Sequence, residues 1–211
     1  MATLEELESL VIKGKAKKVT AAVQELVDEG VSPSEALNTM IGAMGIVGEK
    51  FKNGEIFVPE MLVAAKSMKS GVEVLKPYLA SGEVGALGTV IIGTVSGDMH
   101  DIGKNLVAMM IESKGFTVVD LGVDVPKEKF VEACLEHPEA KVVALSALLT
   151  TTMGAMEETV ELLNSQEFRN RIKIMVGGAP VTKEFCEKIG ADAFTQDAAS
   201  AAEKAKELIG A

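Results

Sequence analysis

The sequence predicts an α/β protein, in which an N-terminal four-helix bundle precedes a flavodoxin-like (Rossmann-like), doubly wound sheet of five parallel strands. Three observations support this. Residues 3–81 show helical apolar spacing, residues 82–88 are rich in glycine, and β-branched apolar runs then alternate with amphipathic helices. The runs are apolar almost throughout, which indicates strands covered on both faces. We therefore place a helical domain at residues 1–84 and an α/β domain at residues 85–211.

The helical part carries start and stop signals for individual helices. Thr3 with Glu6, and Ser32 with Glu35, fit the capping box that opens a helix. Gly30 is typical of a helix end. The predicted helices are Leu4–Ile12, Ala16–Asp28, Pro33–Phe51 and Pro59–Ala80. The short links between them are typical of an antiparallel bundle.

The second part alternates strands and helices in a regular order. The predicted strands are Thr89–Val95, Thr117–Leu121, Lys141–Leu148, Ile172–Val176 and Ala191–Thr195. The predicted helices are Ile102–Lys114, Lys127–Glu136, Met153–Ser165, Lys183–Lys188 and Ala198–Ile209. We expect the strand order 2-1-3-4-5, in which a ligand binds beyond the carboxyl ends of strands one and three. A ligand should therefore contact the loops after Val95 and Leu148.

The composition excludes several classes of protein. The 211 residues are 47% hydrophobic, and 31 acidic against 21 basic residues give a formal charge of -10. This charge repels a nucleic-acid backbone. No apolar run approaches the roughly 20 residues that cross a bilayer. Cys134 and Cys186 have no metal-ligating neighbour in sequence and are expected to be buried thiols. We expect a cytoplasmic protein without a membrane or nucleic-acid partner.

The loop after the first predicted strand carries an imidazole between two carboxylates. Residues 97–105 read GDMHDIGKN, which has neither the Gly-Lys-Ser/Thr ending of a phosphate loop nor the spacing of a dinucleotide site. Asp98 can accept a hydrogen bond from Nδ1 of His100, which would leave Nε2 pointing outward as a metal ligand. A solvated turn histidine is the alternative, and local chemistry leaves both interpretations open.

Three motifs in this part resemble those of a known family. Residues 98–103 match the D-x-H-x-x-G signature of cobalamin-binding domains, such as those of methionine synthase and of the corrinoid proteins of methyltransferase systems. Residues 146–148 (SAL) match the S-x-L of that family, and residues 177–178 match its G-G pair. Because the three motifs occur in order, each at the end of a predicted strand, the chain is identified as a member of this family.

The resemblance implies a base-off cobalamin or related corrinoid, whose nucleotide tail enters a slot in the sheet domain. His100 would then be the axial ligand of the cobalt. Asp98 and then Ser146 would extend a relay behind it, so that a proton can be taken up when the cobalt sheds axial ligands. Gly177 and Gly178 would leave room for the tail. The implied cofactor-binding residues are Gly97, Asp98, Met99, His100, Asp101, Ile102, Gly103, Ser146, Leu148, Thr150, Gly177, Gly178, Met61 and Leu62.

The helical part resembles the cap over the upper face of the corrin in the same family. The similarity lies in residues 54–65, GEIFVPEMLVAA. Phe57, Met61, Leu62 and Met68 are candidates for the lid, with plain bundle core as the alternative. Thr150, Thr151 and Thr152 could offer hydroxyls to the cofactor, although such residues are also ordinary caps at a strand-to-helix junction. Of these threonines we keep Thr150 as a site residue.

The resemblance further implies a methyl carrier rather than a complete enzyme. A substrate-specific corrinoid methyltransferase would transfer a methyl group from an amine, a methoxylated compound or a quaternary ammonium to the cobalt, giving the methylcobalamin form. A second methyltransferase would pass it to tetrahydrofolate or coenzyme M, and a reductive activase would restore oxidised cobalt. The axial ligand and the hydrogen bonds behind it tune the metal.

Two other classes share parts of this layout. A cobalamin-dependent sensor would use the same two parts to control a partner or DNA, but the sequence has no basic DNA-binding segment and no Trp. A receiver-type phosphoacceptor needs an Asp at the end of the third strand, where this chain has residues 146–148, SAL. The sensor is kept as the alternative function.

Overall fold

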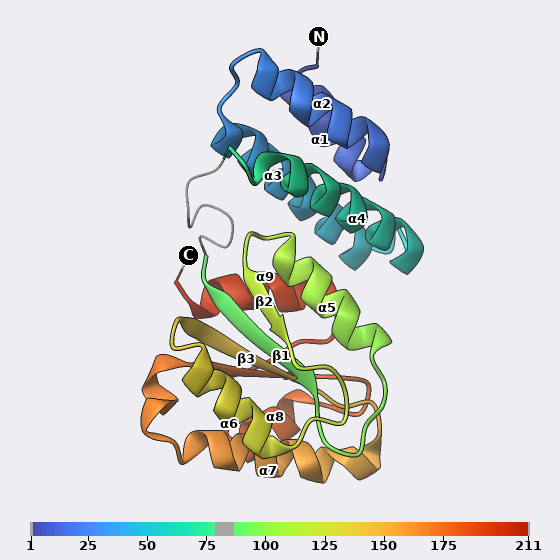
Figure 1. Cartoon of the computed structure of the whole chain (residues 1–211). Helices are drawn as coiled ribbons and strands as arrows, with labels where there is room; N and C mark the ends of the chain where they lie inside the picture. The colour runs from blue at the N-terminus through green and yellow to red at the C-terminus, as the bar shows by residue number, and fades with distance from the viewer. Residues whose placement is uncertain (1, 79–86, 211) are drawn as a thin grey trace. The chain divides into compact units, whose positions relative to one another are not determined.

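The computed structural model describes residues 2–78 and 87–210, which form two compact units. One is the N-terminal helical unit, and the other is an α/β unit that begins at Leu87. In Figure 1 the helical unit is coloured from blue to teal and the α/β unit from green to red. The predicted boundary between residues 84 and 85, and most of the glycine-rich stretch, lie outside the described residues.

The helical unit contains the predicted bundle. Within residues 2–78 its helices are α1 (Leu4–Ile12), α2 (Ala16–Asp28), α3 (Pro33–Lys52) and α4 (Val58–Leu75). Each buries one apolar face, and Leu7, Val23 and Met44 are among the fully buried side chains. The hydroxyl of Thr3 accepts the N–H of Glu6 at 3.1 Å and caps α1 as predicted.

One predicted cap and one predicted helix end are wrong in the helical unit. Helix α3 begins at Pro33, with proline at the first helical position as predicted, but the side chain of Ser32 makes no capping hydrogen bond. Helix α4 ends at Leu75 rather than at Ala80, which lies outside the described residues. The reason is Pro77, because a proline has no N–H with which to continue the helical hydrogen bonds.

The α/β unit has the predicted topology. Its strands are β1 (Thr89–Thr94), β2 (Thr117–Asp120), β3 (Ala140–Ser146), β4 (Lys173–Gly177) and β5 (Ala193–Phe194). Its helices are α5 (Ile102–Glu112), α6 (Lys127–Glu136), α7 (Met153–Asn164), α8 (Lys183–Ile189) and α9 (Ala198–Leu208), with 3-10 turns η1 (Thr150–Thr152) and η2 (Glu167–Arg171). All strands are parallel in the order β2-β1-β3-β4-β5, which confirms the flavodoxin-like sheet. Helices α5 and α9 cover one face, and α6, α7 and α8 the other (Figure 1).

The last strand is shorter than predicted. β5 pairs with β4 only at Ala193 and Phe194. Just before it, the N–H of Ile174 on β4 donates to the carboxylate of Asp192 at 2.7 Å, so a side chain takes the place of a strand hydrogen bond. Such a substitution cannot be recognised from an apolar run alone.

The core on the α6, α7 and α8 side of the sheet contains Ile91, Val143, Ile174 and Phe130, all completely buried. Gly93 in β1 makes room for the aromatic ring, because a Cβ there would lie 2.8 Å from Cζ of Phe130. The strand therefore has no side chain at this point, and the ring of α6 packs directly on its backbone.

Lys104 of α5 forms an ion pair at the carboxyl end of β2. Its Nζ lies 2.7 and 2.5 Å from the two carboxylate oxygens of Asp120 and 2.7 Å from Oδ1 of Asn105. The lysine side chain is 2% exposed, whereas that of Asp120 is 39% exposed. If Lys104 were removed, the carboxylate of Asp120 could be hydrated by water. If Asp120 were removed, the ammonium of Lys104 would stay buried and could not be hydrated.

We expect Asp120→Ala to lower the free energy of unfolding by about 3 kcal/mol, because it leaves the ammonium of Lys104 buried without its counter-charge. Lys104→Met should cost less, about 1 kcal/mol, because the half-exposed carboxylate of Asp120 then faces water. Urea unfolding of the two variants without cofactor measures the difference. Equal losses would contradict this asymmetry.

Candidate functional site

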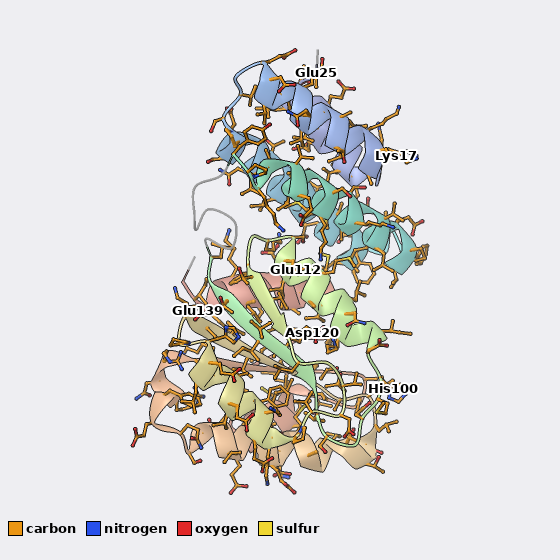
Figure 2. All side chains as sticks on the ribbon, in the orientation of Figure 1. Lys17, Glu25, His100, Glu112, Asp120 and Glu139 are labelled. Atoms are coloured by element: carbon orange, nitrogen blue, oxygen red, sulfur yellow. The ribbon has the colours of Figure 1, made fainter. Side chains whose placement is uncertain are left out.

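Three loops meet at the carboxyl end of the sheet, following β1, β3 and β4. The N–H of Val95 donates to the carbonyl of Ser146 at 3.0 Å, and the N–H of Ala147 donates to the carbonyl of Gly177 at 3.2 Å. Because β1, β3 and β4 are neighbours in a parallel sheet, all three predicted motifs arrive at one edge. Figure 2 shows His100 at this edge, on the loop between β1 and α5.

His100 and Asp98 form the predicted pair. Nδ1 of the imidazole lies 2.7 Å from Oδ1 of Asp98, and the backbone N–H of His100 donates to the same oxygen at 3.1 Å. The hydroxyl of Thr94 donates to the carbonyl of His100 at 2.9 Å. The imidazole is 50% exposed, whereas the carboxylate is 0% exposed. One face of the pair is therefore anchored in the protein and the other is open to a ligand.

The second carboxylate oxygen of Asp98 is bound by the loop after β3. The N–H groups of Leu148 and Leu149 lie 2.7 and 3.3 Å from Oδ2, and the hydroxyl of Thr152 lies 2.8 Å from it. Burial alone would raise the pKa of Asp98, but the donors from Leu148, His100 and Thr152 together hold that pKa well below its usual range. Asp98 is therefore an ionised acceptor.

This ionisation determines which nitrogen of His100 carries the proton. A carboxylate can only accept hydrogen bonds, so the ring nitrogen at 2.7 Å from it, Nδ1, is the donor. The lone pair of Nε2 then remains available for a metal.

Thr152, rather than Ser146, supplies the hydroxyl behind Asp98. Among the described residues, the hydrogen bonds of the Asp98 carboxylate do not include Oγ of Ser146, which had been expected to continue the relay. The chain turns through η1 after β3, and this 3-10 turn brings the buried Thr152 back over Asp98. The run of threonines after S-x-L was the sequence signal for this hydroxyl. Spacing alone did not identify which threonine binds Asp98. Thr150 is exposed.

The glycines of the site allow close approach of backbones. Gly178 has φ +128°, and a Cβ there would lie 1.8 Å from the carbonyl oxygen of Ala147. At Gly177 the nearest atom would be the carbonyl oxygen of Thr195 at 3.4 Å, an ordinary contact. Gly178 therefore lets the loop after β4 lie directly against the loop after β3.

The two loops of the site expose several apolar side chains. Met99 is 69% exposed and Ile102 is 79% exposed, and Leu148 and Leu149 are exposed large hydrophobic residues of the facing loop. Exposed apolar side chains on the loops that carry a polar binding group are typical of a ligand surface. The other predicted loop residues, Gly97, Asp101 and Gly103, are also exposed.

In the helical unit the lid candidates divide into two groups. Met61 and Met68 are buried, as expected for bundle core, so they cannot touch a cofactor without rearrangement. Phe57 and Leu62 are exposed. Of the two helical residues predicted to bind cofactor, only Leu62 is therefore accessible.

Other metal chemistry has no support in the described residues. No group of three or more metal-ligating side chains occurs among them, and Cys134 and Cys186 are buried free thiols as predicted. Burial raises the pKa of Cys134 to about 11. A single imidazole with a fixed tautomer suits a metal whose remaining ligands come from a macrocycle.

No helix of the described chain is long and apolar enough to span a bilayer.

Comparisons with known proteins identify the family of the chain. Models of a B12 binding domain match residues 88–206 and residues 3–76. The chain is 43% identical over 208 residues to dimethylamine corrinoid protein 2 of Methanosarcina acetivorans, covering 98% of this chain and 95% of that one. It is also similar to the structure of a cobalamin-binding protein from Desulfitobacterium hafniense, with a TM-score of 0.82, 30% identity and 98% of both chains covered.

A chain in the crystal structure of a methanol:cobalamin methyltransferase complex from Methanosarcina barkeri is similar as well. The TM-score is 0.84 at 29% identity, over 97% of this chain and 78% of that one. Both parts of the chain thus match B12 binding domains, and the similarity to corrinoid proteins extends over nearly its full length. The chain therefore belongs to the methyltransferase cognate corrinoid proteins, which bind cobalamin or a related corrinoid.

Proposed function

We propose that this protein carries a methyl group between two methyltransferases on a base-off corrinoid whose cobalt has His100 as its axial ligand. The observation that carries the proposal is the imidazole locked by Asp98, with Nδ1 2.7 Å from a buried carboxylate and half of the ring exposed. When bound, the corrinoid supplies a cobalt that accepts and releases the methyl group. The protein supplies the ligand, its orientation and the surrounding surface.

Asp98 and Thr152 have two tasks in this proposal. While Nε2 of His100 is a ligand, the carboxylate fixes the ring and raises its basicity through the Nδ1 proton. When Nε2 is released, the carboxylate 2.7 Å from Nδ1 keeps the ring in its place. The donors from Leu148 and Thr152 keep Asp98 ionised in both situations.

The remaining site residues line the cofactor surface. Ser146 and Gly177 at the strand ends, with Gly178, would border the slot for the nucleotide tail. Met99, Ile102 and Leu148 would pack on the apolar parts of the corrinoid, since burying them removes exposed hydrophobic surface from water. Leu62 and Phe57 would contribute to a lid from the helical unit, which would shield the reactive cobalt from water.

For the partners, we propose a methylamine methyltransferase as the methyl donor enzyme. Support comes from the similarity to dimethylamine corrinoid protein 2, and from the related chain that occurs in a complex with a methyltransferase. A second methyltransferase acting on tetrahydrofolate or coenzyme M, and a reductive activase, complete the proposed cycle. Methyl transfer from dimethylamine to the cobalamin-loaded protein in the presence of a dimethylamine methyltransferase tests the donor.

The ligand assignment is tested by spectroscopy of the cobalamin-loaded protein. We expect the wild type to give a base-off, histidine-ligated spectrum, with axial nitrogen splitting in the paramagnetic resonance of its Co(II) form. His100→Ala should bind cobalamin but lose this splitting. His137→Ala is the matched control, because the chain has two histidines and His137 pairs with Glu139 at a distant helix end. An unchanged spectrum in His100→Ala would overturn the ligand assignment.

A further inference from the structure

Asp124 has an unusual backbone conformation next to the site. Among residues 2–78 and 87–210 it is the one non-glycine residue with positive φ, at +51°. It lies between β2 and α6, and it is exposed, so burial in a core does not impose this conformation. A left-handed residue other than glycine persists where its surroundings hold it in place.

Three hydrogen bonds hold Asp124 against the loop that carries His100, and one of them is donated by the Ser96 hydroxyl to Oδ1 of Asp124 at 3.4 Å. Its carboxylate Oδ1 accepts the N–H of Gly97 at 2.7 Å, and its own N–H donates to the carbonyl oxygen of Asp98 at 2.9 Å. The left-handed conformation allows one residue to present both its side chain and its N–H to the same loop. Asp124 thus binds three consecutive residues, Ser96, Gly97 and Asp98, the last of which orients the imidazole.

Regular strand pairing ends just before this contact. Val95 and Val125 form an isolated parallel bridge, and the N–H of Val125 donates to the carbonyl of Thr94 at 2.9 Å. Beyond that bridge, the Asp124 carboxylate binds the loop at Gly97, before the loop after β3 binds the side chain of Asp98. Gly97 itself has φ +81°. A glycine backbone can adopt many other conformations unless hydrogen bonds restrain it.

From this geometry we infer that Asp124 is a positioning residue for the axial histidine. This inference rests on the proposed role of His100 as ligand. Asp124 fixes the backbone at Gly97 and Asp98, so that the Asp98–His100 pair has its binding geometry before the cofactor arrives. A ligand held in this way does not lose loop freedom on coordination, and coordination is correspondingly stronger.

Two substitutions separate the acceptor from the backbone conformation. Asp124→Asn keeps an oxygen acceptor and tolerates the left-handed region, whereas Asp124→Gly adopts the same φ freely but has no acceptor. Both should fold, since neither imposes a new backbone conformation. The pair therefore isolates the Oδ1 acceptor, which binds the N–H of Gly97 at 2.7 Å and the hydroxyl of Ser96 at 3.4 Å.

In the cobalamin-loaded protein, we expect Asp124→Gly to weaken axial coordination of Co(II) by about tenfold. Because cobalt sheds its axial ligand on reduction, weaker coordination of Co(II) raises the Co(II)/Co(I) midpoint potential, and tenfold corresponds to about 59 mV for one electron. His100→Ala should shift the potential in the same direction and further. Asp124→Asn should stay near the wild-type value.

In the protein without cofactor, exchange of the Gly97 amide hydrogen should become about tenfold faster in Asp124→Gly and remain slow in Asp124→Asn. A wild type without axial nitrogen splitting would refute the ligand assignment itself. If the wild type shows the splitting and Asp124→Gly retains its potential, the role of Asp124 is refuted while the ligand assignment stands. The role of Asp124 would also be refuted if Asp124→Asn weakened axial coordination as much as Asp124→Gly does. The same holds if Asp124→Gly lost stability without a change in midpoint potential.

Discussion

Replacing Gly178 by alanine is expected to destabilise the cofactor-free protein by about 4 kcal/mol. The new Cβ would lie 1.8 Å from the carbonyl oxygen of Ala147, and that oxygen belongs to backbone, which cannot rotate away like a flexible side chain. In addition, φ at this position is +128°, where an L side chain is strained. Overpacking and backbone strain each cost roughly 1–3 kcal/mol or more. Thermal unfolding should show a drop of about 10 °C.

Gly177 provides the matched control for this variant. It belongs to the same G-G pair, but a Cβ there would meet its nearest atom at 3.4 Å, and its φ is not in the left-handed region. Gly177→Ala should therefore unfold within about 1 kcal/mol of the wild type. If both variants lost the same stability, the close approach at Gly178 would not explain the requirement for glycine.

Asp98→Asn is expected to weaken the proposed axial coordination by His100 by about 10- to 100-fold, the effect typical of residues that orient a metal ligand. The amide can still offer one oxygen to the donors from Leu148 and Thr152. Its NH₂ group then faces the ring and donates to Nδ1, which moves the imidazole proton to Nε2. His100 must lose that proton before it can bind cobalt. Nitrogen NMR of the cofactor-free protein detects the tautomer, and the visible spectrum of the loaded protein detects the coordination.

Asp101 offers a control within the same loop. Its carboxylate accepts a hydrogen bond from the side chain of Asn105 at 3.1 Å and is exposed. Asp101→Asn changes the loop charge by the same amount but leaves the Asp98–His100 pair intact. We expect its tautomer and its spectrum to match the wild type. An equal loss in both variants would mean that charge near the ring, and not the acceptor at Nδ1, controls coordination.

Three helices with local signals have the bounds that the sequence predicts. α1, α2 and α6 begin and end where the sequence analysis placed them, because caps, glycine turns and apolar spacing act within a few residues of one another. β5 was predicted too long because the side chain of Asp192 replaces a strand hydrogen bond. The end of α4 was predicted too late because the effect of Pro77 was not taken into account.

The candidate site shows the same division. The pair of His100 and Asp98 was predictable, since the two residues are two positions apart on one turn and their chemistry is complementary. The sequence by itself thus determined the ligand candidate, its acceptor and, through the order of apolar runs, the edge of the sheet where they lie.

The tertiary structure alone decided which groups hold that acceptor in place. The hydroxyl of Thr152 is 54 positions from Asp98, and the carboxylate of Asp124 is 27 positions from Gly97. Neither pairing can be recognised from a local sequence pattern. The pairings depend on the strand order and on a 3-10 turn that brings one of several similar threonines inward. Hydrogen bonds between loops require positions within about 3 Å, and only the packed sheet sets positions that closely.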